Sequence, residues 1–190
     1  EDGATLLAHL EIIVQYNVQS SEKEKFDGVM LDIEPYISDS WKENPEEYMD
    51  RYISCMKKGY KFAQKNHLRT AICIPRHYDN QGLTSGLEEL IKETCDEVAV
   101  MNYSCGNEIE AIRTEAALSE KYGKELHCIL EFQEVGKHGL TENKTYRNKG
   151  IDNAKETWEK LQKEYKNINV TRDYHWSRPV REMLEEKNAD

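Results

Sequence analysis

The sequence lacks the features that would assign it to several common classes of protein. Acidic residues outnumber basic residues by 36 to 26 in a chain of 190 residues, which gives a net charge of −10. Nucleic acids bind basic surfaces, so this balance argues against a nucleic-acid partner. No stretch approaches the roughly eighteen consecutive apolar residues of a membrane-spanning helix, and we expect no membrane span. The first residues also lack the basic flank of a secretion signal.

Cysteines at metal-binding or redox spacing are absent as well. The five cysteines are dispersed without a C-x-x-C pair, at Cys55, Cys73, Cys95, Cys105 and Cys128. Such a set predicts reduced thiols rather than a disulfide framework or a zinc site. We therefore expect no metal and no other cofactor. The thiols favour a reducing, cytoplasmic compartment, but the sequence leaves the localisation open and does not exclude secretion.

No linker or low-complexity tract divides the chain, and its length fits one domain of residues 1–190. Apolar periodicity alternates between strand-like and helix-like segments. The expected strands are residues 26–34, 69–75, 97–104, 125–132 and 167–176. Each is followed by a helical pattern, of which the clearest is Ile151, Ala154, Trp158 and Leu161 at three-to-four spacing.

Five strands that alternate with helices predict a parallel sheet covered by helices. Two α/β architectures fit this pattern: an open doubly wound sheet, or a stretch of a (β/α)8 barrel. The first strand lacks a G-x-G-x-x-G turn. Ligand sites lie at the carboxyl ends of the strands in both architectures, so the polar residues at those ends do not separate them.

The segment FDGVMLDIEPY, residues 26–36, places two acids at the end of an apolar strand. Because side chains alternate along a strand, Met30, Asp32 and Glu34 share one face, and the other face is wholly apolar. The apolar face should lie against helices, so the acids should point into a barrel at its mouth. Burial and mutual repulsion would raise the proton affinity of one of them, as a general acid requires.

This segment resembles the active-site strand of family 18 glycoside hydrolases, the chitinase and endo-β-N-acetylglucosaminidase group. The family pattern is roughly an aromatic or aliphatic residue, Asp, Gly, apolar, Asp, apolar, Asp, any residue and Glu. The matching positions are Phe26, Asp27, Gly28, Val29, Leu31, Asp32 and Glu34. Met30 departs from the pattern, because the family usually has its first inward-facing acid there. In that family the segment is the fourth strand of a (β/α)8 barrel.

Later segments follow the family's order. Met101 and Tyr103 in VMNYS resemble the Met-x-Tyr of the sixth strand, and Trp176 stands where a tryptophan commonly ends the eighth. The resemblance implies a partial (β/α)8 TIM barrel, strands four to eight with their helices, without the first three strands. We therefore expect the open sheet edge to be covered by a missing N-terminal part or by a second copy in a homo-oligomer.

The resemblance also implies hydrolysis of β-linked N-acetylhexosamine glycans, in which the substrate's own acetamido oxygen attacks the anomeric carbon. Glu34 would be the general acid, and Asp32 would orient the acetamido group and stabilise the oxazolinium intermediate. Tyr103 would hydrogen-bond the acetamido carbonyl, and Trp176 would stack under the sugar. Four further residues at strand ends would contact the carbohydrate ligand: Tyr36, Arg76, His77 and Asn102.

A second hypothesis uses Glu131, in the segment ILEF. Glu34 and Glu131 resemble the acid and nucleophile of the retaining superfamily whose fourth strand ends Asn-Glu-Pro, although Ile33 replaces the asparagine. It requires the two carboxyl groups to lie about 5 Å apart. Glu131 also has a simpler interpretation, which we favour, as the partner of Arg172 or Arg76 in an ion pair.

A third hypothesis is a catalytically weak or inactive barrel that binds a glycan or a protein partner. The absence of an acid at Met30 favours it. Turnover that is abolished by Glu34→Gln would exclude it.

Overall fold

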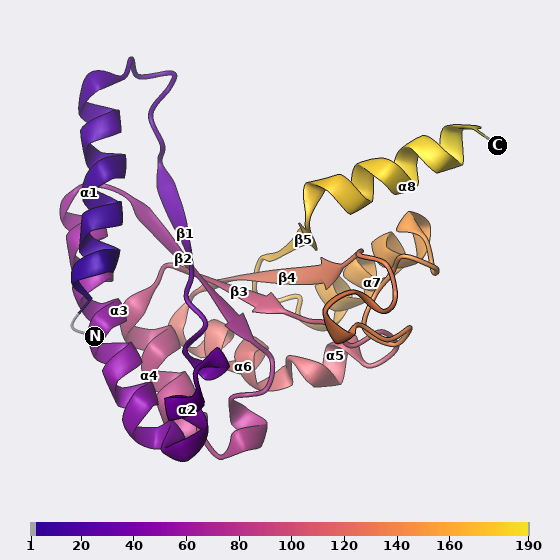
Figure 1. Cartoon of the computed structure of the whole chain (residues 1–190), viewed down its shortest axis with the longest axis horizontal. Helices are drawn as coiled ribbons and strands as arrows, with labels where there is room; N and C mark the ends of the chain where they lie inside the picture. The colour runs from indigo at the N-terminus through magenta and orange to yellow at the C-terminus, as the bar shows by residue number, and fades with distance from the viewer. Residues whose placement is uncertain (1–2, 190) are drawn as a thin grey trace. The chain divides into compact units, whose positions relative to one another are not determined.

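The chain has an α/β fold, in which strands alternate with helices, as predicted (Figure 1). The computed structural model describes residues 3–189, with side chains to residue 186. The elements in chain order are α1 (Ala4–Gln19), β1 (Gly28–Asp32), η1 (Pro35–Ile37), α2 (Asp39–Glu43), α3 (Pro45–Lys65), β2 (Arg69–Pro75), η2 (Asp79–Gln81), α4 (Thr84–Thr94), β3 (Glu97–Met101), α5 (Glu108–Ala111), α6 (Arg113–Tyr122), β4 (Glu125–Glu131), η3 (Lys137–Gly139), α7 (Ile151–Glu164), β5 (Val170–His175) and α8 (Ser177–Ala189).

The strands are hydrogen-bonded in the order β1-β2-β3-β4-β5, and β1–β2 and β4–β5 are parallel pairs. These findings confirm the parallel α/β class. β2 has the predicted bounds, whereas β1 is shorter than predicted because Glu34 leaves the extended conformation and Pro35 starts the 3₁₀ turn η1. The fold divides into two compact units, Glu1–Val98 and Ala99–Asp190, and the boundary falls within β3. A single domain over the whole chain stays a prediction.

In the first unit, β1 and β2 lie side by side, with Gly28 opposite Arg69 and Asp32 opposite Cys73. A side chain at position 28 would place its Cβ only 2.8 Å from the Arg69 carbonyl oxygen. Glycine therefore allows the two strands to begin this close together. β2 is buried from Thr70 to Pro75, so this part of the sheet is covered on both faces.

Three helices of the first unit pack against one another, with α3 in contact with both α1 and α4 (Figure 1). Two glycines permit this close approach. A Cβ at Gly59 would lie 2.5 Å from Leu6 Cδ2 of α1, and a Cβ at Gly86 would lie 2.5 Å from Met49 Cγ of α3. A side chain at either position would require the neighbouring side chain or its helix to shift.

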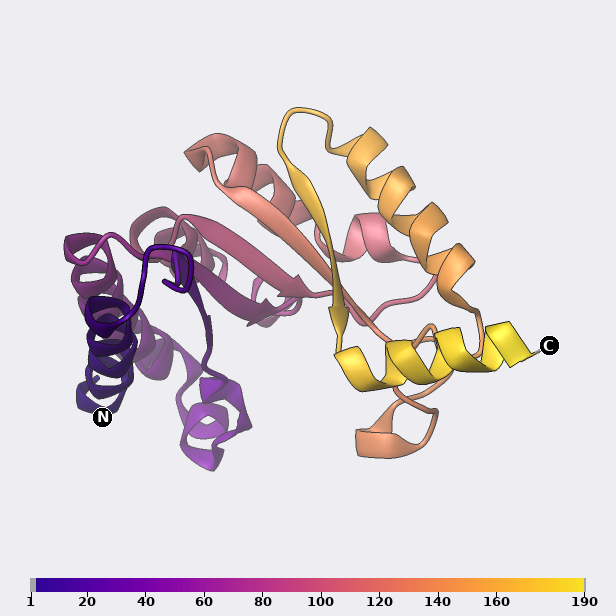
Figure 2. The same cartoon turned by 90° about the horizontal axis from the view of Figure 1, so that it is seen from above.

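In the second unit, β4 and β5 lie side by side, with Leu126 opposite Val170 and Glu131 opposite His175 (Figure 2). Helix α7 covers one face of this pair. Trp158 of α7 donates a hydrogen bond from Nε1 to the Cys128 carbonyl oxygen at 2.9 Å. The opposite face carries two polar cross-strand pairs, since residues in register on parallel strands point to the same side.

None of the helices within residues 3–189 is long and apolar enough to cross a membrane. In the same part of the chain no disulfide joins the five cysteines, and three of them are buried, namely Cys73, Cys95 and Cys128.

Candidate functional site

Glu34 lies directly after β1, where it precedes the 3₁₀ turn of Pro35–Ile37. Its side chain is half-buried. The Tyr36 hydroxyl donates a hydrogen bond to Oε1 of Glu34. Among the side chains of residues 3–186, no donor reaches Oε2. One carboxyl oxygen is therefore held in place, and the other remains open to accept or carry a proton.

Aromatic rings surround this carboxyl group. The Tyr36 ring meets the rings of His77 and Tyr78 edge-on, at centroid distances of 5.2 Å and 6.1 Å. Tyr78 is fully buried and also contacts the ring of Trp41 at 5.5 Å. Burial and the hydrogen bond to Glu34 raise the pKa of Tyr36 well above its usual value, so its hydroxyl stays protonated and acts as a donor.

Asp32 is the last residue of β1, and its side chain is exposed. Its negative charge, like that of Glu34, contributes to the raised pKa of Tyr36, so both carboxylates act on the same hydroxyl. His77 follows β2 and is half-buried; burial and the positive charge of Arg76 lower its pKa. The imidazole of His77 is therefore neutral at pH 7.

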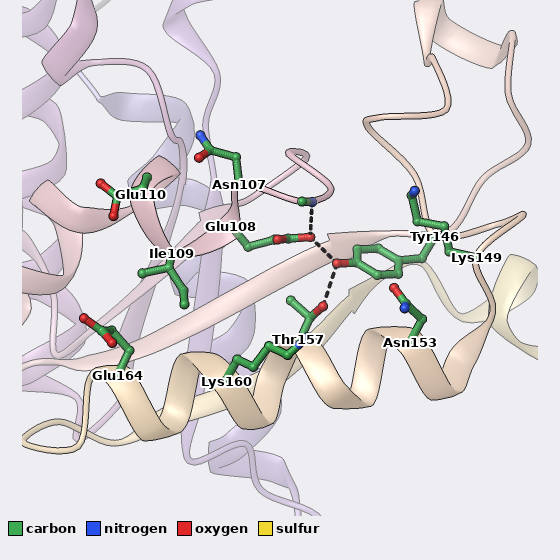
Figure 3. A pocket seen from close by; sticks show the side chains of 11 residues that line it. Asn107, Glu108, Ile109, Glu110, Tyr146, Lys149, Asn153, Thr157, Lys160 and Glu164 are labelled. Carbon is green, nitrogen blue, oxygen red and sulfur yellow. Dashed lines mark hydrogen bonds between the residues drawn. The ribbon is translucent and has the colours of Figure 1, made fainter.

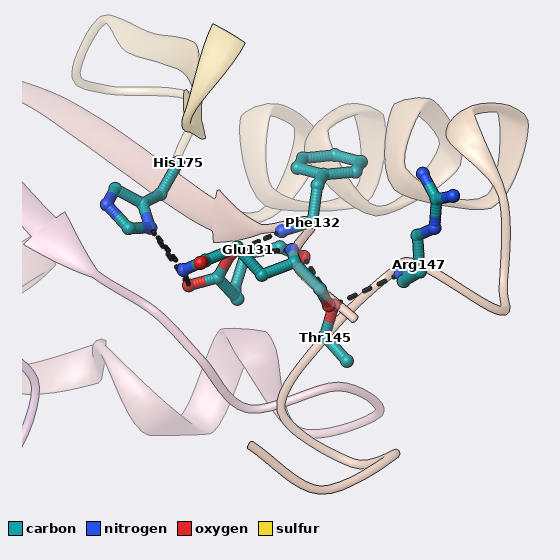
Figure 4. Close-up of polar contacts among 6 residues, drawn as sticks. Glu131, Phe132, Thr145, Arg147 and His175 are labelled. Carbon is teal, nitrogen blue, oxygen red and sulfur yellow. Dashed lines mark hydrogen bonds and ion pairs between the residues drawn. The ribbon is translucent and has the colours of Figure 1, made fainter. Parts of the chain in front are cut away.

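Glu131 lies at the carboxyl end of β4 in the second unit, and its carboxylate has several hydrogen-bond contacts (Figure 4). It is only 2 % exposed. Oε1 accepts hydrogen bonds from the backbone N–H groups of Phe132 and Gln133, both at 2.8 Å. Oε2 accepts from Gln133 Nε2 at 3.2 Å and lies 2.9 Å from His175 Nδ1. Since an ionised carboxylate only accepts hydrogen bonds, Nδ1 of His175 carries the hydrogen.

The charge state of Glu131 follows from these contacts. Burial raises the pKa of its carboxyl group, but the hydrogen bonds from His175 and Gln133 outweigh burial and hold the pKa below its usual value. The expected ion pair of Glu131 with Arg172 is wrong, because His175, Gln133 and Phe132 supply the carboxylate's contacts among the described side chains of the second unit. Arg76 belongs to the first unit, so its pairing with Glu131 stays a prediction. Arg172 instead approaches Gln162 and Glu159 of α7, since its side chain points to the helix-covered side of β5.

A second acid–histidine pair lies on the same face of β4 and β5 as Glu131 and His175. His127 Nδ1 is 3.0 Å from Asp173 Oδ2, and Thr171 Oγ1 donates to Asp173 Oδ1 at 3.0 Å. The side chains alternate along both strands, so this face carries both polar pairs together with the buried Ile129. The sequence analysis missed both pairs, because neither histidine is near its acid in the sequence.

The other predicted site residues of the second unit have different environments. The Tyr103 ring is half-buried, with its centroid 6.1 Å from that of His175. Trp176 directly follows β5 and is 44 % exposed, beside Arg147 and Arg178 in a depression of about 100 Å³. Asn102 is only 1 % exposed, and its Nδ2 donates to the Glu108 carbonyl oxygen at 2.9 Å, so it anchors the chain instead of facing solvent.

A pocket of about 560 Å³ in the second unit was not predicted (Figure 3). Its buried wall contains a carboxylate and two hydroxyls, from Glu108, Tyr146 and Thr157. The sequence carries no signal that joins these three residues, because they lie on separate segments. Across residues 3–189, no group of three or more His, Cys, Asp or Glu residues is placed to hold a metal ion.

Within the first unit, the structure groups Glu34, Tyr36 and His77, and within the second it groups Tyr103 with His175 and Glu131. Glu34 and Glu131 belong to different units, so their separation stays a prediction.

Comparison with protein-family models, with curated proteins and with solved structures gives no match for this chain. The likeness to family 18 therefore rests on the residues of the sequence motifs alone.

Proposed function

We propose that the protein is a glycoside hydrolase that acts on β-linked N-acetylhexosamine glycans, with Glu34 as general acid. One observation carries the proposal: the half-buried Glu34 carboxyl follows the carboxyl end of a parallel strand, with Oε1 fixed by Tyr36 and Oε2 open. Active sites of parallel α/β folds lie at that end of the strands. Asp32, two residues earlier, completes the Asp-x-Glu arrangement of the family 18 motif.

In the proposed reaction, Oε2 of Glu34 gives its proton to the glycosidic oxygen as the bond to the anomeric carbon breaks. The acetamido carbonyl oxygen of the substrate attacks that carbon and forms an oxazolinium ring. Asp32 accepts a hydrogen bond from the acetamido N–H and offsets the positive charge of the ring. Glu34, now ionised, takes a proton from water, which opens the ring and restores the original configuration.

The aromatic residues near Glu34 suit a carbohydrate ligand. Tyr36 and His77 present half-buried rings, and neutral His77 can donate or accept a hydrogen bond from a hydroxyl. Arg76 directly follows β2 and adds a donor at the same strand end. The roles of Tyr103, Trp176 and Asn102 in substrate binding stay predictions from the resemblance, as does the use of Glu131 as a nucleophile.

We also infer that β1 to β5 correspond to strands four to eight of a (β/α)8 barrel. In a closed barrel β1 would pair with another strand on the side away from β2. A groove of about 860 Å³ runs along β1 between it and α1, and Phe26 and Met30 at this groove are half exposed. This exposed apolar edge is consistent with the further strand, from the same chain or from a second copy, that the barrel requires.

Hydrolysis assays with chitooligosaccharides and N-glycans test the proposed function. We expect turnover by the unchanged protein, with the β-anomer as the first product by NMR, because the mechanism retains configuration. Glu34→Gln removes the transferable proton and should lower kcat by about 10²- to 10⁴-fold. Glu43→Gln is the matched control, because it removes the same charge from an exposed position on α2 of the same unit.

A second function, glycan binding without hydrolysis, has one structural feature in its favour. Met30, where the family motif has an acid, is 49 % exposed and offers the sugar no carboxylate. Saturable glycan binding by calorimetry, without turnover in any variant, would establish this function and exclude the hydrolase. Equal turnover in Glu34→Gln and Glu43→Gln would remove Glu34 from the mechanism.

A further inference from the structure

The pocket of about 560 Å³ in the second unit lies between the short helix α5 and one face of α7 (Figure 3). Four residues of α7 line it at helical spacing, namely Asn153, Thr157, Lys160 and Glu164. The other side of α7 packs inward through Ala154, Trp158 and Leu161. One face of this helix therefore supports the fold, while the other forms the wall of a polar cavity.

Helix α5 is fixed in place through its backbone carbonyls. Asn102 Nδ2 donates to the Glu108 carbonyl oxygen at 2.9 Å, and the Tyr165 hydroxyl donates to the Ile109 carbonyl oxygen at 2.6 Å. These two contacts hold the one-turn helix so that the Glu108 side chain points to the pocket wall (Figure 3).

The hydrogen bonds around Glu108 all donate towards its carboxyl group. The Tyr146 hydroxyl and the Gly106 backbone N–H both donate to Oε1 of Glu108, the latter at 2.8 Å. Because the one hydrogen of Tyr146 is used in this way, Thr157 Oγ1, 2.8 Å away, must donate to the Tyr146 oxygen. Burial and the hydrogen bond to Glu108 raise the pKa of Tyr146 well above its usual value. All of these donors therefore point towards the Glu108 carboxyl group, directly or through the Tyr146 oxygen.

None of these donors carries a charge. Glu108 is only 8 % exposed, yet no cationic side chain within residues 3–186 forms an ion pair with it. Both of its hydrogen bonds end on Oε1, and Oε2 accepts none from the same part of the chain. A buried carboxylate without a cation is unfavourable, and a positive group at Oε2 would offset the lost hydration.

We propose that this pocket is a binding site for a small ligand that carries a protonated primary amine, with the ammonium group on Oε2 of Glu108. The other charges of the lining are compatible with such a ligand. The lining contains three acids and two lysines, so it carries one more negative than positive charge. The lining shares no residue with the proposed site at Glu34, so the proposal can be tested independently of the proposed hydrolysis.

The test uses 4-amino-1-butanol as the probe and 1,4-butanediol as its uncharged isostere, on the whole chain. We expect the amine, but not the diol, to cause saturable shifts of the backbone amide resonances of Gly106 and Asn107. Glu108→Gln should weaken amine binding by about tenfold or more, since it removes a charge-assisted hydrogen bond. Glu110→Gln is the control on the same helix, because Glu110 is exposed and paired with Arg113.

A second variant tests the pocket without changing the hydrogen-bonded residues Glu108, Tyr146 and Thr157. Asn153 is exposed on the pocket wall, so Asn153→Trp should fill the cavity without disturbing Glu108, and it should also abolish the shifts. Circular dichroism and thermal melting check that each variant is folded. Equal binding of the diol, undiminished binding in Glu108→Gln or Asn153→Trp, or the absence of saturable shifts would each overturn the proposal.

Discussion

Glu34 and Glu131 show how the same residue type at the end of a parallel strand can have very different bonding environments. Glu34, in the first unit, has one hydrogen bond to its carboxyl group, from the neutral hydroxyl of Tyr36. Glu131, in the second unit, has four contacts with donor nitrogens, from two backbone N–H groups, an amide and His175. Glu34 is also the more exposed of the two, because its side chain is half-buried whereas that of Glu131 is only 2 % exposed.

The difference concerns which carboxyl group can exchange a proton. A carboxylate whose two oxygens are both occupied by donors is held ionised, and its main effect is to orient those donors. Glu131 fixes the tautomer of His175 and the start of the loop after β4. Glu34 keeps one oxygen open, which is what an acid that gives up and regains a proton needs. The comparison favours Glu34 as the reactive group and Glu131 as a positioning group.

The largest expected difference in stability is between Glu131→Gln and Glu34→Gln. Glutamine at 131 replaces an acceptor by an NH2 group that faces His175 and Gln133, so buried donors lose their partner. We expect Glu131→Gln to lower the free energy of unfolding by about 2 to 3 kcal/mol. Glu34→Gln should change it by less than about 1 kcal/mol, because Oε1 can still accept from Tyr36. Urea unfolding followed by circular dichroism measures both.

Glu120→Gln is a control for Glu131→Gln, because Glu120 is an exposed acid of α6 in the same unit. A loss of stability in Glu34→Gln as large as that in Glu131→Gln would show that both carboxyl groups are structural. The distinction between them would then be lost.

The free energy of unfolding should also change with pH, by a smaller amount, in two separate pH ranges. The pKa of Glu131 lies below its usual value of about 4.5, so its contribution is present above that value and is lost as the pH falls through the folded-state pKa. The pKa of His77 lies below 6.5, so the unfolded chain binds its proton first, and stability falls as the pH drops from 6.5 towards the folded-state pKa. Urea titrations from pH 3 to pH 8 test both windows.

The pH-dependent change in stability within each range should disappear in one variant only. Glu131→Gln should flatten the stability profile in the acid window, and His77→Gln should flatten it just below pH 6.5, because each removes the group that titrates there. If His77→Gln left the profile unchanged below pH 6.5, burial of neutral His77 would not contribute to the stability of the first unit.

The sequence predicted the features of the fold that depend on the local periodicity of apolar residues. The five strands, their helices and the strand-end positions of Glu34 and Glu131 follow from apolar alternation, and β2 has the predicted bounds because an uninterrupted apolar run ends at a proline. It did not predict the partners of buried polar groups. Glu131 meets His175 because β4 and β5 pair in register, and this pairing is not encoded near either residue.

The pocket at Glu108 was missed for a related reason. Its polar wall joins a one-turn helix, a loop residue and α7, through Glu108, Tyr146 and Thr157. Apolar periodicity identifies only the inward face of α7 and treats the opposite face as solvated. A hydrogen-bond chain between three segments becomes visible only when the segments are placed in space.

Tyr36→Phe should have the smallest effect on stability and is the most specific test of the difference between Glu34 and Glu131. Phenylalanine keeps the ring that packs on His77 and Tyr78 but removes the hydroxyl that holds Glu34. We expect the free energy of unfolding to change by less than about 1 kcal/mol, because the open side of Glu34 lets water replace the lost donor. Turnover should nevertheless fall by about tenfold, since an acid that is free to rotate spends less time aligned with the leaving oxygen.

The matched change in the second unit is Gln133→Ala, which removes one of the four contacts of Glu131. The remaining contacts still fix that carboxylate, so turnover should stay close to that of the unchanged protein. Assays of kcat and KM on both variants, with unfolding measured in parallel, separate the two carboxyl groups. If Tyr36→Phe left kcat unchanged while Gln133→Ala lowered it, the reactive carboxyl group would have to be sought at Glu131, because sensitivity to a single donor marks the group that must be aligned.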